Sequence, residues 1–205
     1  MEGDFDSTGI SAEDALGRLT RGNERFVRGE THLRGLLGKT PAELADSQHP
    51  FATVLGCSDS RVPPELVFDA GLGELFVVRV AGNVMSPEVA GSLQYAGAHL
   101  HTPLFVVLGH EGCGAVSAAL ETRDRGERHR SRIQILVDGI LPGLPKFDSL
   151  LSPKARLAQA VESNVRWTVR QIAESPEGRA RQAEGRMKVI GALYEFASGR
   201  VRFLT

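Results

Sequence analysis

The sequence has few cysteines, no long apolar run and almost no net charge, and each absence excludes a class of protein. No stretch approaches the ~18 apolar residues of a membrane-spanning helix. The start, Met-Glu-Gly-Asp-Phe-Asp, lacks the apolar core of a signal peptide. A formal net charge of -1 at pH 7 gives no attraction to nucleic acid or to an anionic membrane. We therefore predict a cytoplasmic protein with neither of these partners.

The two cysteines, Cys57 and Cys113, have a narrow range of possible roles. In the reducing cytoplasm a disulfide between them is unfavourable. Each thiol is therefore either an inert core group or a group with a chemical role. Their sequence neighbours favour the second interpretation, as the motifs below show.

The length and composition predict one globular domain. The chain has 205 residues, of which 41% are hydrophobic and 24% charged, enough for one sizeable core. There is no internal repeat and no low-complexity linker. We therefore predict a single domain over residues 1–205, with residues 1–10 as a flexible N-terminus.

Three continuous apolar runs indicate buried strands: Phe51 to Gly56, Leu75 to Val80 and Leu104 to Gly109. They are short, rich in Val and Phe, and bounded by Gly or Pro, which is typical of parallel strands covered on both faces. Between the second and third, Ser86-Pro87-Glu88 has the pattern of a helix start and is followed by an apolar stripe at helical spacing. This order predicts a βαβ unit.

Further helices and strands complete the predicted fold. Ser11 and Gly29 bound an amphipathic N-terminal helix, and other helices should begin near Gly112 and after Ser152-Pro153. Two C-terminal strands are expected, over Lys188 to Glu195 and Arg200 to Leu204. Together these elements predict an α/β fold with a mostly parallel central β-sheet flanked by helices.

Polar clusters follow two of the predicted strands. "CSDSR", residues 57–61, follows the first strand, and "GHEGCGA", residues 109–115, ends the third where a helix begins. Carboxyl ends of parallel strands are where open α/β sheets place their chemistry. His110 and Cys113 are spaced so that both side chains can bind one ion at this corner. The N-terminus of the following helix favours the ionised thiol of Cys113. Cys57 can supply a third ligand.

Two cysteines and one histidine form a ligand set used by catalytic zinc, which keeps one coordination position open. No cysteine remains to close the site, and the other histidines (32, 49, 99, 101 and 129) lack ligand-like spacing to either motif. We therefore predict one Zn²⁺ per chain, held by Cys57, His110 and Cys113.

Asp59 and Arg61 follow Cys57 closely enough to act beside the metal. An ionised Asp59 can accept the proton of a zinc-bound hydroxide and so orient it, and Arg61 can keep the carboxylate ionised and off the metal. The alternative is an exposed turn pair with no catalytic role. The neighbouring zinc ligand favours the catalytic dyad.

At these residues the sequence resembles the β-class carbonic anhydrases of the plant-type branch, and the resemblance covers nearly the whole chain. "CSDSR" together with "GHEGCG" is similar to the metal and dyad signature of that family. The resemblance implies a zinc lyase that interconverts carbon dioxide and bicarbonate. It also implies an intertwined homodimer that can pair into tetramers, with an N-terminal helix that packs on the dimer partner.

The resemblance extends to the residues that bind substrate. It implies that Gln48, Phe76 and Tyr95 line the carbon dioxide pocket, some of them across the dimer interface, and that the backbone amide of Gly114 binds a substrate oxygen. Separately, because two thiolates already neutralise the zinc, we expect Asp59 to become the fourth metal ligand at low pH, when hydroxide no longer competes for that position.

Two other functions fit the same residues. One is hydrolysis of a related small molecule such as carbon disulfide on the same scaffold. The other is a non-catalytic module that binds zinc, bicarbonate or a protein partner. Such a module would have no need of the Asp59 and Arg61 pair, and so the presence of both favours the enzyme.

Overall fold

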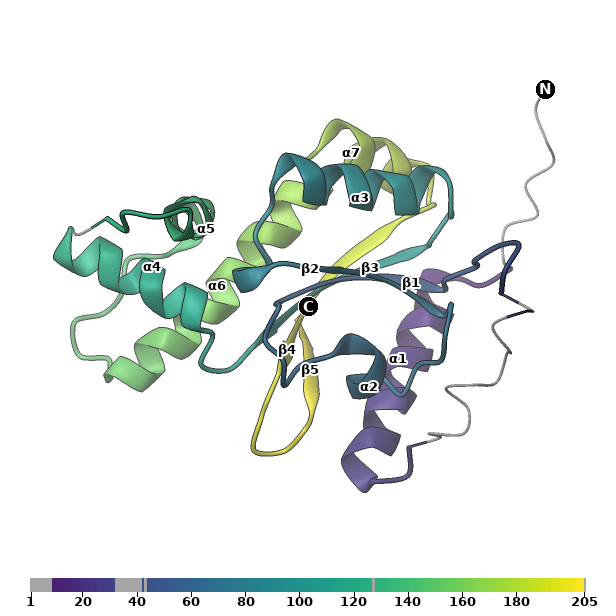
Figure 1. Ribbon diagram of the computed structural model, residues 1–205, viewed down its shortest axis with the longest axis horizontal. Helices are drawn as coiled ribbons and strands as arrows, with labels where there is room; N and C mark the ends of the chain where they lie inside the picture. Colours follow the sequence, from purple (N-terminus) through teal and green to yellow (C-terminus); the bar gives the residue numbers. More distant parts are fainter. Residues whose placement is uncertain (1–8, 32–41, 43, 127, 205) are drawn as a thin grey trace.

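A five-stranded sheet forms the centre of the computed structural model, which describes residues 9–31, 42, 44–126 and 128–204 (Figure 1). The strand order is β2-β1-β3-β4-β5, with only the β4–β5 pair antiparallel. The strands are β1 (Ala52–Gly56), β2 (Leu75–Arg79), β3 (Leu104–His110), β4 (Lys188–Tyr194) and β5 (Val201–Leu204). The predicted α/β fold with a mostly parallel sheet is confirmed.

Strands β1 and β3, which are neighbours in the sheet, carry the site at their ends. Every residue of β1 and β3 is buried, which explains their continuous apolar sequences. In the sheet register Gly56 of β1 lies beside Arg79 of β2 and Leu108 of β3. The carboxyl ends of the three strands therefore meet at one edge, where the polar motifs follow.

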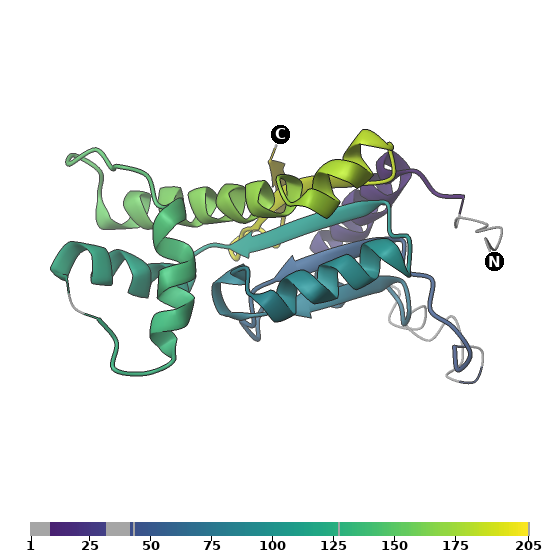
Figure 2. The same cartoon turned by 90° about the horizontal axis from the view of Figure 1, so that it is seen from above.

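Helices cover both faces of the sheet. One face packs against α3 (Pro87–Ala98) and α6 (Pro153–Ala173), and α4 (Gly114–Arg125) and α5 (Ile133–Ile140) extend the same hydrophobic cluster. The other face packs against α1 (Ala12–Arg28) and α2 (Pro64–Val67). A further helix, α7 (Pro176–Ala183), lies beside α3. Figure 2 shows α4 and α5 projecting beyond the carboxyl end of β3. None of the helices described is both long and apolar enough to cross a bilayer.

The predicted helix starts are confirmed at the level of single hydrogen bonds. The hydroxyls of Ser11, Ser86 and Ser152 each accept from the backbone N–H three residues later, at the starts of α1, α3 and α6. Gly29 ends α1 in the left-handed conformation, with φ 67°. The short helices α2, α5 and α7 were not predicted.

Helix α1 packs on the sheet of its own chain. Ala15 and Leu19 are fully buried, and a Cβ at Gly22 would lie 1.8 Å from the carbonyl oxygen of Phe68. Only glycine permits this close approach. Packing of α1 on a dimer partner stays a prediction. Of the flexible N-terminus predicted over residues 1–10, residues 1–8 lie outside the described part of the chain.

Asn23 ties α1 to two distant segments. Its amide nitrogen donates to the carbonyls of Val67 and Gly199, at 3.1 and 3.0 Å, and its oxygen accepts from the Val201 N–H at 2.8 Å.

Asn23→Ala leaves these three backbone groups without their partner. We expect the free energy of unfolding to fall by about 2 to 4 kcal/mol, measured by urea denaturation. The exposed neighbour Glu24→Ala should change it by less than about 0.5 kcal/mol. An Asn23→Ala variant as stable as wild type would contradict this assignment.

Candidate metal centre

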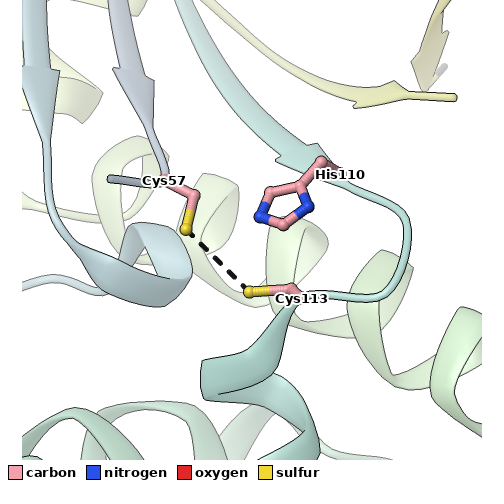
Figure 3. A group of neighbouring side chains, drawn as sticks. All are labelled: Cys57, His110 and Cys113. Carbon is pink, nitrogen blue, oxygen red and sulfur yellow. Dashed lines mark hydrogen bonds between the residues drawn. The ribbon is translucent and has the colours of Figure 1, made fainter. Parts of the chain in front are cut away.

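Three buried side chains meet at the carboxyl edge of the sheet. Cys57 directly follows β1, His110 ends β3, and Cys113 immediately precedes α4. Their side chains point toward one another (Figure 3). The two sulfurs are 4.0 Å apart, and the three potential ligand atoms all lie within 4.8 Å of one another. The structure thus brings together the three residues that the sequence predicts as metal ligands.

The geometry fits a tetrahedral zinc ion. With Zn–S bonds of ~2.3 Å, tetrahedral coordination places two sulfurs about 3.8 Å apart. His110 Nδ1 lies 2.9 Å from the Glu111 carbonyl oxygen, to which it must donate, so Nε2 carries the free lone pair. Nε2 is buried and hydrogen-bonds to none of the described residues. An unpartnered acceptor beside two thiols is what a soft divalent cation requires.

The two thiols are not equivalent. A hydrogen bond from Cys113 lowers the pKa of Cys57, and the N–H of Gly82, 3.3 Å from the Cys57 sulfur, lowers it further. The same bond to Cys57, together with burial, raises the pKa of Cys113. One proton is therefore shared between the sulfurs. A cation between them would take the place of that proton.

Asp59 lies beside this group and is paired with Arg61. The Arg61 guanidinium donates to both carboxylate oxygens, at 2.9 and 2.8 Å, and the Arg61 backbone N–H donates to Oδ1 at 3.0 Å. The side-chain hydrogen bonds from Arg61 are the main reason that the pKa of Asp59 lies far below its usual range. Asp59 Oδ2 is 3.8 Å from His110 Nε2. An ionised carboxylate therefore lies next to the proposed metal ligands.

Two residues that the sequence did not single out hold this corner in place. The Arg79 guanidinium donates to the carbonyls of Cys57 and Asp59, at 3.1 and 2.6 Å. The ring of Phe196 lies under the Arg61 guanidinium, 4.1 Å from its carbon, and meets the His110 ring edge-on. Arg79 is the one charged residue in the predicted strand Leu75 to Val80, a signal that could have identified it. Phe196 gives no such signal, because it reaches the site only through the β4–β5 turn.

The predicted pocket residues do not gather at the metal ligands of their own chain. Phe76 pairs with Thr53 in the sheet, three positions or about 10 Å before the strand ends. Tyr95 is 48% exposed, and its ring lies 6.2 Å from that of Phe76. Gln48 is exposed and precedes β1, whereas Cys57 follows it. Gly114, by contrast, begins α4 directly beside Cys113.

Four of the remaining histidines, numbers 49, 99, 101 and 129, lie in the described part of the chain. None of them joins the group of three, and no Asp or Glu of the described residues does either. His32 lies outside the described residues. Within the described ranges, the ligand set is therefore two cysteines and one histidine, as predicted.

Comparison with known families and sequences supports the sequence resemblance. A family model described as carbonic anhydrase matches residues 52–201. A carbonic anhydrase of Mycolicibacterium smegmatis is 40% identical, over 89% of this chain and 88% of that protein. Carbonic anhydrase 2 of Mycobacterium tuberculosis strain H37Rv is 39% identical, over 89% of this chain and 87% of that protein.

Solved structures with the same fold are β-carbonic anhydrases. The β-carbonic anhydrase CcaA superimposes with a TM-score of 0.72 and 25% identity, over 93% of this chain and 95% of that one. The Coccomyxa β-carbonic anhydrase, solved with acetazolamide, gives 0.72 and 27%, over 92% and 86%. A tetrameric β-carbonic anhydrase of Sordaria macrospora gives 0.69 at 24% identity, over 94% and 92%, which shows the fold alone.

Proposed function

The chain belongs to the β-class carbonic anhydrases and is an enzyme of that family. We propose that it hydrates carbon dioxide reversibly with one zinc ion, which Cys57, His110 and Cys113 hold. The observation that supports this most strongly is the buried group of two thiols and an unpartnered imidazole nitrogen, beside an ionised carboxylate. When bound, zinc supplies the Lewis acid that makes water a nucleophile near neutral pH.

Asp59 is proposed to orient the water that attacks carbon dioxide. Its carboxylate stays ionised because of Arg61, and can therefore accept a hydrogen bond from that water. Oδ1 already accepts two hydrogen bonds from Arg61, whereas Oδ2 accepts one and keeps a second lone pair for that water. Arg61 in turn holds the carboxylate through two parallel bonds, which fixes its plane. Asp59 as a fourth metal ligand at low pH stays part of the proposal.

The substrate pocket is proposed to form between two copies of the chain. Tyr95 is half exposed beside Phe76, which belongs to the edge strand β2. We propose that these two rings and Gln48 line the pocket next to the metal ligands of the partner, and that the backbone N–H of Gly114 binds a substrate oxygen. The active form would then be a homodimer, alone or paired into a tetramer. A cytoplasmic location also stays a proposal.

Mixed dimers test whether Tyr95 acts across the interface. Cys57→Ser removes a metal ligand, and Tyr95→Ala should lower kcat/KM about 10-fold. Co-expression of the two variants places a wild-type site in every mixed dimer if Tyr95 serves the partner. Roughly a quarter of wild-type activity is then expected, against roughly a twentieth if Tyr95 serves its own chain. Activity near the lower value would contradict the shared pocket.

A stopped-flow assay of carbon dioxide hydration tests the function directly. The protein loaded with one zinc per chain should hydrate carbon dioxide, and chelation of the metal should abolish the activity. A substrate panel that includes carbon disulfide distinguishes the related hydrolase. Stoichiometric zinc with no turnover of either substrate would favour the non-catalytic module instead.

A further inference from the structure

A short turn beneath the metal ligands connects Cys57 to helix α6. The turn is the 3-10 segment η2 (Ala81–Asn83), and its Gly82 N–H donates to the Cys57 sulfur at 3.3 Å. Asn164, in the middle of α6, donates from Nδ2 to the Gly82 carbonyl oxygen at 2.8 Å. We infer that Asn164 is a positioning residue for the Cys57 thiolate, which it influences by fixing this turn. The inference rests on the zinc site proposed above.

One backbone hydrogen bond, from the Asn83 N–H to the Val80 carbonyl at 2.9 Å, closes the turn, but Gly82 departs from helical geometry. Gly82 and Asn83 both have positive φ, 73° and 44°, a conformation that glycine adopts without preferring it and that asparagine tolerates better than most residues. Two side chains of α6 hold its carbonyls, since Thr168 Oγ1 also donates to Asn83 O at 3.2 Å. The N–H and C=O of Gly82 are separated by only two rotatable bonds. A shift of the carbonyl therefore turns the N–H that faces the sulfur.

The turn also has little space in which to relax. A Cβ on Gly82 would lie 2.9 Å from Ile140 Cδ1 and 3.0 Å from Ala115 Cβ. The Gly82 backbone is thus pressed between α4, α5 and α6. With Asn164 in place, the N–H of Gly82 has one direction available, toward Cys57.

Stability alone does not explain an asparagine at position 164. The residue is 1% exposed, and its Oδ1 has no hydrogen-bond partner among the described residues. The buried Asn83 Nδ2 likewise has no partner there. A buried polar group that is only half satisfied costs stability, and this cost offsets part of what the hydrogen bond to Gly82 O contributes. The bond to Gly82 O is the one contact that requires this residue type.

The bond from Gly82 changes the chemistry of the Cys57 sulfur. A backbone N–H that points at a thiolate stabilises the charge on sulfur, so the sulfur gives less electron density to a bound cation. The cation then remains a stronger Lewis acid. Asn164 would thereby tune the metal from outside the ligand shell, without touching substrate or metal.

Cobalt substitution reports the state of the thiolate directly. In the Co²⁺-loaded protein, the thiolate-to-metal charge-transfer bands should move to longer wavelength in Asn164→Leu, because the sulfur electrons are no longer stabilised by the Gly82 N–H. Asn164→Ser, whose hydroxyl is too short to reach Gly82 O, should show the same shift. In the zinc-loaded enzyme, both variants should lose about 3- to 10-fold in kcat with KM unchanged.

Asn23→Ala is the matched control, because it removes another buried asparagine, which lies on α1 and hydrogen-bonds neither the metal ligands nor the Gly82 turn. Its bands should stay at the wild-type position despite its lower stability. Three outcomes would overturn the inference but leave the zinc site standing. They are wild-type bands in the Asn164 variants, an equal shift in Asn23→Ala, and failure of both Asn164 variants to fold. Wild-type protein that binds no cobalt would instead overturn the metal assignment.

Discussion

Asp59→Asn is expected to lower kcat/KM for carbon dioxide hydration about 100- to 1,000-fold, while the protein still binds one zinc per chain. The amide has the shape of the carboxylate but no charge. Its NH₂ group would face one nitrogen of the Arg61 guanidinium as a second donor, so one of the two parallel hydrogen bonds would be lost and only the amide oxygen would still accept. The nucleophilic water would then lose its fixed acceptor. Stopped-flow kinetics and metal analysis on the same preparation measure both quantities.

A second Asp–Arg pair in the chain provides the control. Asp138 on α5 accepts from one Arg128 nitrogen through both of its oxygens, at 3.1 and 2.8 Å, at the exposed surface. Asp138→Asn should therefore keep wild-type kcat/KM. This control shows whether the effect comes from losing any surface carboxylate or from losing the carboxylate of Asp59. A fully zinc-loaded Asp59→Asn enzyme within about twofold of wild type would contradict the role assigned to Asp59.

Local patterns made most of the fold and the ligand set predictable. The continuous apolar runs identified β1 and β3, and the motifs at their ends identified Cys57, His110 and Cys113. Because β1 and β3 are neighbouring parallel strands, they end at the same edge of the sheet, which brings residues far apart in the sequence together. The ligand set therefore followed from the fold class and two short motifs.

Residues that act through tertiary contacts were not predictable in this way. Asn164 lies in an amphipathic helix where any small residue fits the pattern, and its partner Gly82 is 82 positions away. Phe196 reaches Arg61 only because the β4–β5 hairpin folds over the site. Helix α5 begins without a side-chain cap at Arg132, so its start carries no sequence signal. No local periodicity encodes such contacts.

The pocket residues differ in kind from both groups. Phe76 and Tyr95 were predicted from the family resemblance, and in one chain they lie beside each other but away from the metal ligands. If a second chain completes the site, the position of these rings in a single chain says little about their role. The mixed-dimer experiment therefore tests a prediction that neither sequence periodicity nor single-chain geometry decides.

Cys57→Ser is expected to remove zinc and, with it, a large part of the thermal stability. A ligand that binds only the folded state stabilises by about 4 kcal/mol when its free concentration is 1,000 times its Kd. For a domain of this size, that corresponds to a melting temperature lower by about 8 to 16 °C. The substitution is nearly isosteric, so little of this loss comes from packing in the buried corner. Calorimetry with zinc in excess measures the difference.

Chelation separates the metal from the side chain as the cause of this loss. Wild-type protein treated with a strong chelator should melt near Cys57→Ser, because both lack the ion. The variant itself should not respond to the chelator, whereas Asp138→Asn should respond as wild type does. If chelation leaves the wild-type melting temperature unchanged while Cys57→Ser still lowers it, then Cys57 acts as a core residue. The two sulfurs, 4.0 Å apart in their buried corner, would in that case be packing groups, and the assignment of a zinc enzyme would lose its foundation.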